Sequence, residues 1–506
     1  MPRHSCGRRS YFFSMSDRRA ILSESPMMKR VGNGRRALFG PRFRIPRKGR
    51  IRFALVLVGL IAVVKIFSSR EPVDRVSAPD EVPAPEKHAA TAPPASAQTA
   101  APARAHHSLL GLFKPEIPRH SFSAAVLAGL LKKYPPRLNV SSDTVASGGR
   151  SYVFHYSFDS TIARCGQTLL RQYHPKYGAV VAMEAATGRV LALVSYTREA
   201  EPPLGDNLFA RSLFPAASVF KTVTASAAIE KGHMNPDSRV PLAGRRYTLY
   251  RFQLKEELTS YEPVSLQDAY AYSINPVFGR IGVYVLGPEI IREYIGKFGF
   301  NCDIPFELDN ERPVASIADK DSTLLVAEIA SGFNGKTKMS PLFGAMLAAG
   351  VSEKGRMPAP FFVDSVTCGG DSCIIFRAAP RVWRSPVRET TAGLLKGMMM
   401  RVAQYGTARN SFRYIKHSAQ FDDIDYGGKT GSVDEDGLGK VDWFIGFASN
   451  PSDARQRIAV GVVTVHDQFW TVHSSYIGAE IFRKYIRKEQ KLEKAAVVKN
   501  ASRPVG

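Results

Sequence analysis

The pattern of hydrophobic and polar residues changes along the chain, and each change predicts a different kind of element. Residues 53–64 form an unbroken apolar run, flanked by Arg52 and Lys65. A membrane-spanning helix needs roughly 20 apolar residues, but the aliphatic stems of the two flanking cations can extend a shorter one to the headgroups. A cleaved signal peptide is the alternative, and no small-x-small cleavage site directly follows the run. The pattern therefore predicts an uncleaved membrane anchor over 53–69.

Hydrophobic periodicity is absent from the next stretch, residues 70–107. From Pro72 to His107 the chain has 11 Ala and 7 Pro in 36 residues. Because Pro-rich chain extends at about 3.1 Å per residue, this segment predicts a disordered linker that holds a domain up to roughly 100 Å from the bilayer. Residues 108–150 predict a small helical junction, with a short amphipathic helix from Ala124 to Leu131.

Strand and helix patterns that belong to one globular domain begin near residue 151. Two apolar runs, 178–184 and 189–195, flank a turn and predict a β-hairpin. Helical segments follow, and strand patterns return at 443–448 and 458–465. An early hairpin and late strands imply an α+β fold in which both ends of the domain close one antiparallel sheet. The domain is expected to span 151–490, with a last helix over 477–490 and a charged tail over 491–506.

Composition and charge exclude several classes of protein. The 506 residues are 44% hydrophobic and 23% charged, which excludes general disorder, collagen and a small disulfide scaffold. The net charge is +24, but residues 1–52 hold 15 Lys and Arg against Asp17 and Glu24. A basic leader before a membrane anchor is typical of a topology signal, which places the N-terminus in the cytoplasm and the rest outside. We therefore expect no nucleic-acid partner.

The cysteines predict at most one disulfide. Cys368 and Cys373 flank a Gly-Gly-Asp-Ser sequence, and such a turn can bring two thiols together in an oxidising compartment. No histidine lies nearby, so a zinc site is not expected. The isolated Cys165 and Cys302 are interpreted as core residues.

Candidate chemistry begins in the apolar helix predicted from Pro215 to Gly232. A spacing of three residues puts Ser218 and Lys221 on one face of this helix, one turn apart. A serine hydroxyl needs an adjacent base to be a nucleophile, and a lysine desolvated by apolar neighbours loses enough basicity to serve as that base. Because Ser-x-x-Lys also occurs by chance, an N-capping serine beside a solvated lysine is the competing interpretation.

Two further motifs favour the catalytic interpretation. Ser273-Ile-Asn275 follows the first motif, and Lys429-Thr430-Gly431-Ser432 comes later in the chain. Three motifs in this order form the signature of serine acyl-transferases that react with penicillins.

With these motifs, the chain from about 150 to 490 resembles the transpeptidase domain of high-molecular-weight, class B-like penicillin-binding proteins. The likeness extends to the 178–195 hairpin, to 265–273, 340–349 and 406–408, and to 442–447. It implies a β-lactamase/transpeptidase-like fold, with a five-stranded antiparallel sheet flanked by helices and an all-α subdomain. It also implies peptidoglycan stem peptides and β-lactams as partners, and neither a metal nor an organic cofactor.

The resemblance assigns a role to each motif residue. Ser218 is the expected nucleophile and Lys221 its base, while Ser273 relays a proton to the leaving amine and Asn275 positions the lysine and the substrate amide. The substrate-binding and oxyanion-hole groups are expected as follows: Lys429 and Thr430 on the terminal carboxylate, Gly431 for close approach of the peptide, and the backbone N–H groups of Ser218 and Ser432 on the oxyanion.

The sequence disfavours one related function and leaves two alternatives. A class A β-lactamase needs a Glu-x-x-Leu-Asn loop, and the nearest match, Glu307 to Asn310, has the wrong spacing and predicts a surface turn. A D,D-carboxypeptidase differs only in passing the acyl group to water. A catalytically silent penicillin-binding scaffold or sensor is the second alternative, which the intact motifs disfavour.

Only 108–150 separates linker and catalytic domain, so we expect no glycosyltransferase domain. Polymerisation must then occur on a separate glycan polymerase. That polymerase, with division or elongation proteins, is a candidate partner, but the pedestal through which class B members would contact it is missing or very reduced. Localisation is expected in the cytoplasmic membrane, with the catalytic domain outside.

Overall fold

The structure is a computed structural model that describes residues 123–199, 204, 206–258, 261–368 and 373–501. The expected leader (1–52), anchor (53–69) and linker (70–107) lie outside the described residues. Within the described ranges, no helix is long and apolar enough to cross a membrane.

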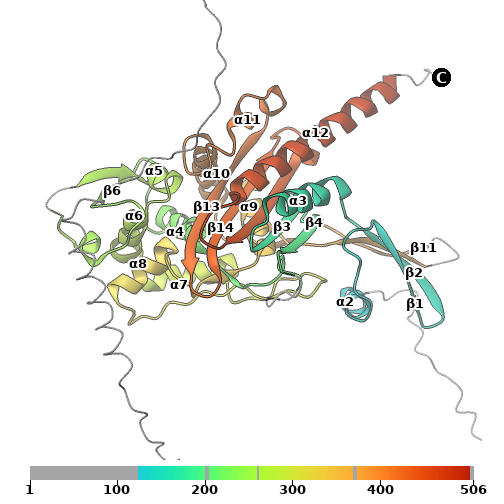
Figure 1. The fold of residues 1–506 in the computed structure, drawn as a ribbon, viewed down its shortest axis with the longest axis horizontal. Helices are drawn as coiled ribbons and strands as arrows, with labels where there is room; N and C mark the ends of the chain where they lie inside the picture. Colours follow the sequence, from blue (N-terminus) through green and yellow to red (C-terminus); the bar gives the residue numbers. More distant parts are fainter. Residues whose placement is uncertain (1–122, 200–203, 205, 259–260, 369–372, 502–506) are drawn as a thin grey trace, which may run out of the picture. The chain divides into compact units, whose positions relative to one another are not determined.

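A five-stranded antiparallel sheet forms the centre of the domain, with strand order β13-β14-β15-β3-β4 (Figure 1). The strands are β3 (Tyr177–Glu184), β4 (Val190–Thr197), β13 (Asp425–Glu435), β14 (Gly439–Ser449) and β15 (Arg457–His466). The early hairpin β3–β4 pairs with the late strand β15, which confirms that both ends of the domain close one sheet. Strand β13, which carries the Lys-Thr-Gly motif, lies at one edge.

Helices cover both faces of this sheet, which explains why its central strands are almost continuously apolar. Adjacent residues of β14 point to opposite faces. Ile445 meets Gly344 of α9 (Pro341–Ser352), whereas Phe444 meets Gly478 of α12 (Ser474–Ala501). Helix α3 (Ser160–Tyr173) packs beside α12 on β4.

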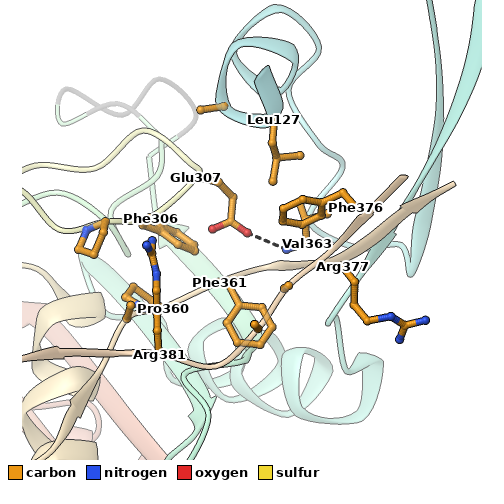
Figure 2. A pocket seen from close by; sticks show the side chains of 14 residues that line it. Leu127, Phe306, Glu307, Pro360, Phe361, Val363, Phe376, Arg377 and Arg381 are labelled. Atoms are coloured by element: carbon orange, nitrogen blue, oxygen red, sulfur yellow. Dashed lines mark hydrogen bonds between the residues drawn. The ribbon is translucent and has the colours of Figure 1, made fainter. Parts of the chain in front are cut away.

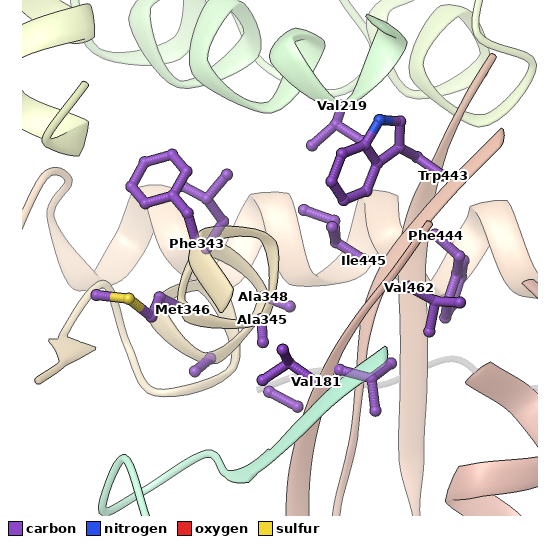
Figure 3. Packing of buried hydrophobic residues seen from close by; sticks show 14 of the residues in the cluster. Val181, Val219, Phe343, Ala345, Met346, Ala348, Trp443, Phe444, Ile445 and Val462 are labelled. Carbon is purple, nitrogen blue, oxygen red and sulfur yellow. The ribbon is translucent and has the colours of Figure 1, made fainter. Parts of the chain in front are cut away.

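Helix α9 is buried along its whole length and lies against β14, β15 and β3 (Figure 3). Gly461 of β15 permits this contact, because a Cβ at that position would lie 2.0 Å from the Pro341 carbonyl oxygen. The side chains of Phe343, Met346 and Ile445 fill the space around the helix. α9 is therefore the central element of the core.

A helical subdomain lies between the two halves of the sheet in sequence. Its elements are α4 (Lys221–Glu230), α5 (Leu266–Ala271), α6 (Asn275–Arg280), a π-helical turn (Ile281–Leu286), α7 (Gly287–Phe298) and α8 (Thr323–Ser331), with the hairpin β6 (Arg239–Leu242) and β7 (Glu262–Ser265). Helix α10 (Glu389–Gln404) packs on β13 and α9, and the short α11 spans Arg413–Lys416. Two-residue strands β5 (Phe214–Pro215) and β8 (Lys338–Met339) pair with each other, as do β9 (Met357–Pro358) and β12 (Val382–Arg384).

The expected helical junction is helical only in part. Helix α2 (Ala124–Lys133) is present, but it is followed by a strand that joins a second, four-stranded sheet across the expected boundary at 150. This sheet has the order β1-β2-β10-β11, with β1 (Ser142–Ser147), β2 (Arg150–Tyr156), β10 (Val363–Cys368) and β11 (Cys373–Arg377). The last helix also runs beyond 490, so most of the expected charged tail is helical.

Glu307 is not the surface turn residue that the sequence predicts. Its carboxylate accepts hydrogen bonds from the backbone N–H groups of Phe362 and Val363, and burial raises its pKa. Figure 2 shows this carboxylate between Leu127 of α2 and the strand after Phe361. A local turn motif cannot reveal such a contact, because its partners lie more than 50 residues away.

Cys368 and Cys373 are directly opposite in the β10–β11 pair, and both are free thiols. The expected disulfide is therefore not formed in the structure, although paired positions on antiparallel strands lie within the Cα separation that a disulfide spans.

Candidate active site

Ser218 lies on a 3₁₀ turn (Ala217–Phe220) that leads into α4. The helix predicted from Pro215 therefore begins with a tighter turn. Trp443 of β14 fixes this turn, because its indole N–H donates to the Pro215 carbonyl at 2.7 Å. Ala217 has a positive φ of 47°, which is rare for a residue with a Cβ. The turn places Ser218 between the central sheet and the helical subdomain.

Lys221 begins α4 and is completely buried. Its Nζ lies 2.7 Å from Ser218 Oγ, 2.7 Å from Asn275 Oδ1 and 2.6 Å from the Ser331 carbonyl oxygen. Two of these neighbours only accept hydrogen bonds, whereas the hydroxyl can also donate. A neutral amine therefore satisfies all three, by donating to Asn275 and Ser331 and accepting the proton of Ser218.

The second motif lies on the turn between α5 and α6. Ser273 has a φ of 56°, and Asn275 is the first residue of α6. Two hydrogen bonds hold Asn275 in place. Its side-chain Nδ2 donates to the Tyr247 carbonyl at 3.2 Å, and its backbone N–H donates to the Arg246 carbonyl at 2.8 Å. These contacts orient Oδ1 towards Lys221.

The third motif lies on the edge strand β13. Lys429 Nζ is 2.9 Å from Ser273 Oγ, so the second and third motifs are in direct contact. The Thr430 hydroxyl is 2.5 Å from that of Thr407. At Gly431 a Cβ would lie 3.1 Å from the backbone nitrogen of Ser218, so the strand passes directly beside the nucleophile turn. Ser432 is exposed and pairs with Asp442 across the sheet.

Burial controls the protonation of the two lysines. Burial, and secondarily the charge of Lys429, lowers the pKa of Lys221 well below its usual value. Burial lowers the pKa of Lys429 to about 7. Near neutral pH the pair can therefore hold a neutral amine beside Ser218, which is the form that a general base requires.

The motifs meet in a cleft of about 270 Å³. It is lined by Ser218, Tyr247, Ser273, Asn275, Phe333, Thr407, Thr430, Gly431, Ser432, Asp442, Trp470, His473 and Ser475. All predicted site residues line it except the two lysines, which lie beneath its surface. Among the described residues, no cluster of His, Cys, Asp and Glu could hold a metal ion.

Sequence reasoning missed several residues of this site. Ser331 contributes only its backbone carbonyl, for which a sequence carries no signal. Trp470 and His473 come from the loop between β15 and α12, and their rings lie 5.3 Å apart. The carboxylate of Asp442, whose Oδ2 lies 3.7 Å from His473 Nδ1, raises the pKa of His473. No motif marks this loop, so only its place in the lining of the cleft reveals it.

Comparisons with known proteins agree with this geometry. A profile of the penicillin binding protein transpeptidase domain matches residues 178–487, more than half of the chain. The peptidoglycan D,D-transpeptidase PbpA of Mycolicibacterium smegmatis is 24% identical over 320 residues, which cover 56% of this chain and 62% of that protein. The chain thus aligns with less than two thirds of the length of this relative.

Two solved structures share the fold. The D,D-transpeptidase domain of a peptidoglycan glycosyltransferase from Eggerthella lenta has a TM-score of 0.56 at 22% identity, covering 71% of this chain and 87% of that one. Penicillin-binding protein A of M. tuberculosis, solved as an imipenem acyl-enzyme complex, has a TM-score of 0.52 at 23% identity, covering 65% and 79%. With the domain match over 178–487, they place this chain in the family of penicillin-binding proteins that carry the transpeptidase domain.

Proposed function

We propose that this protein is a D,D-transpeptidase that cross-links peptidoglycan stem peptides through an acyl-enzyme on Ser218, and that penicillins acylate the same serine. The observation that carries the proposal is the buried Lys221, whose amine touches both Ser218 Oγ and Asn275 Oδ1. A lysine that serves only to stabilise a helix would be solvated, because burying an ammonium group is costly.

In the proposed reaction, Ser218 Oγ attacks the carbonyl carbon of the penultimate D-Ala and Lys221 takes the hydroxyl proton. The C–N bond to the terminal D-Ala then breaks, and that amine leaves with a proton relayed through Ser273. An acceptor amine from a second stem peptide attacks the ester, which restores the Ser218 hydroxyl. The Ser218 proton moves to Lys221, with which Ser218 is already in hydrogen-bond contact, and then passes through Ser273 to the leaving amine. In the second half-reaction the acceptor amine gives up one proton, which returns to Ser218 Oγ.

The roles of the third motif follow from its place on an edge strand. An extended stem peptide can pair with the free edge of β13, and Gly431 leaves room for its backbone. The substrate carboxylate would bind Lys429 and Thr430, whose hydroxyl Thr407 orients. The backbone N–H groups of Ser218 and Ser432 would bind the oxyanion, and one such donor contributes about 3–4 kcal/mol to transition-state stabilisation in other enzymes.

Topology and partners belong to the same proposal. The apolar run 53–64 after a basic leader supports a single-pass protein of the cytoplasmic membrane with its catalytic domain outside. A separate glycan polymerase would then make the strands that this enzyme cross-links.

Labelling of the full chain with a fluorescent penicillin, followed by intact mass, tests the acyl-enzyme. We expect one stable adduct on the wild type, none on Ser218→Ala, and a normal adduct on Ser226→Ala, a control on the same helix. No adduct on folded wild-type protein would refute the proposal and favour a silent scaffold. An adduct that clears within seconds would indicate a β-lactamase.

A second assay distinguishes the transpeptidase from the carboxypeptidase. The full chain is incubated with a stem pentapeptide, with and without a second peptide that carries an acceptor amine, and the products are read by mass. A cross-linked dimer supports transpeptidation. A shortened peptide alone, at every acceptor concentration, would indicate a D,D-carboxypeptidase.

A further inference from the structure

An exposed loop at the mouth of the cleft has an unusual composition. Residues 245–252, here named the aromatic-basic loop, read Arg-Arg-Tyr-Thr-Leu-Tyr-Arg-Phe. Six of these eight residues are arginine or aromatic, and all six are exposed. The rings of Tyr247, Tyr250 and Phe252 are 60%, 56% and 51% exposed. Large aromatic side chains that gather on a surface mark a binding site more often than they serve a fold.

The loop is fixed in place from beneath. Gln253 is completely buried, and its Nε2 donates to the carbonyl oxygens of Ala243 and Arg245 at 2.8 and 3.1 Å. Its Oε1 accepts from the backbone N–H of Tyr250 at 2.9 Å. Leu249 packs into a small buried cluster below. The exposed side chains are thus presented by an ordered backbone, which lowers the entropy cost of binding through them.

The exposed side chains combine two stacked aromatic rings with a basic stretch of chain. The Tyr250 and Phe252 rings stack with their centroids 5.9 Å apart and their planes 19° from parallel. Between 239 and 255 the chain has the cations Arg239, Arg245, Arg246, Arg251 and Lys255, and no acidic residue. Flat rings suit the apolar face of a pyranose, while guanidinium groups suit carboxylates.

The loop is also continuous with the cleft. Tyr247 lines the cleft that contains Ser218, and the backbone carbonyls of Arg246 and Tyr247 both accept hydrogen bonds from Asn275. A substrate that enters the cleft therefore passes the loop. This continuity favours the substrate over a lipid surface as the partner, although aromatic and basic residues also occur at membrane interfaces.

We propose that the aromatic-basic loop binds the glycan strand of peptidoglycan, with sugar rings on Tyr250 and Phe252 and stem-peptide carboxylates on the arginines. This inference rests on the proposed function for the identity of the substrate. It extends that function because it assigns a separate site to the part of the substrate that does not react.

Co-sedimentation with protein-free, insoluble peptidoglycan tests the proposal, using the full chain in detergent. We expect Tyr250→Ala/Phe252→Ala to bind at least about tenfold more weakly than the wild type, as truncation of aromatic anchors does elsewhere. Arg251→Glu, which reverses one exposed charge and leaves both rings in place, is expected to weaken binding as well. Tyr414→Ala is the matched control, since Tyr414 is 66% exposed on α11 with Arg413 over its ring.

Two further measurements separate the outcomes. Glycan strands stripped of their stem peptides by an amidase should bind the wild type and not the double variant. Unchanged binding in the double variant, or no binding by the wild type, would overturn the proposal. The proposal would also be overturned if the double variant lost binding to vesicles of phosphatidylglycerol and phosphatidylethanolamine but still bound peptidoglycan. That result would indicate a membrane-facing surface.

Penicillin labelling keeps the two proposals apart. If the double variant loses peptidoglycan binding but is still acylated, both proposals are supported. If the wild type binds peptidoglycan through the loop yet is never acylated, the loop assignment stands and the proposed function fails.

Discussion

Replacement of Lys221 by methionine is the most direct test of the proposed chemistry. Methionine has a similar length, so Lys221→Met keeps the buried volume and removes only the amine. The change deletes the contacts of Nζ with Ser218 Oγ at 2.7 Å, Asn275 Oδ1 at 2.7 Å and the Ser331 carbonyl at 2.6 Å. Ser218 then has no group in hydrogen-bond contact that can take its proton.

The expected magnitude follows from these contacts. General-base catalysis contributes about 10²- to 10⁴-fold, which corresponds to roughly 3–5 kcal/mol in the activation free energy. Asn275 Oδ1 and the Ser331 carbonyl oxygen lose the amine that donates to them, and each loss lowers the free energy of unfolding by about 1–3 kcal/mol. Loss of a buried amine, whose pKa burial lowers, acts in the opposite direction. The acylation rate should therefore fall by about 10²- to 10⁴-fold, whereas the free energy of unfolding changes only by the difference between two opposing terms.

The assay is the second-order rate constant for acylation by a fluorescent penicillin, with Tm measured on the same samples. Lys231→Met is the control, because Lys231 lies at the exposed end of the same helix. An acylation rate within about threefold of the wild type for Lys221→Met would refute the role of Lys221 as the base.

Three other predictions concern a buried lysine, a glycine in the core and a pair of thiols on adjacent strands. Burial lowers the pKa of Lys429 to about 7 in the folded state, and the unfolded lysine titrates near 10.5. Between these two pH values the unfolded chain therefore binds more protons than the folded chain, so this residue makes the stability rise with pH from about 7 to 10.5. Lys429→Met removes this contribution and should flatten the pH dependence of Tm. Gly461→Ala should destabilise the domain by about 3 kcal/mol, because the new methyl group would lie 2.0 Å from the Pro341 carbonyl oxygen; an unchanged Tm would contradict this packing. Under oxidising conditions Cys368 and Cys373 should form a disulfide, seen as loss of both alkylation sites by mass, and full alkylation after oxidation would refute it.

Local pattern was sufficient to predict most regular elements of the central sheet. Strands β3, β4, β14 and β15 can be predicted from their apolar runs without reference to distant residues, because each strand is long and largely buried on both faces. The junction before residue 150 was harder. Strand β1 is short and half-exposed, and among the described strands it pairs only with β2, so its residues show no apolar face that would distinguish a strand from a loop.

Sequence alone determined which residues carry the candidate chemistry. The side-chain types and spacing of Ser218, Lys221, Ser273, Asn275 and Lys429 follow from the order of three motifs, since each motif holds its residues within one turn or one strand.

Only the tertiary structure decided how these motifs act on one another. It places Lys429 Nζ at 2.9 Å from Ser273 Oγ across 156 residues of chain, and it adds the Ser331 carbonyl to the surroundings of Lys221. It also buries both lysines, which lowers their pKa values, and it brings Tyr247 of the aromatic-basic loop into the lining of the cleft. The physical reason is that desolvation and contact depend on everything packed around a group, whereas a sequence motif specifies only its chain neighbours.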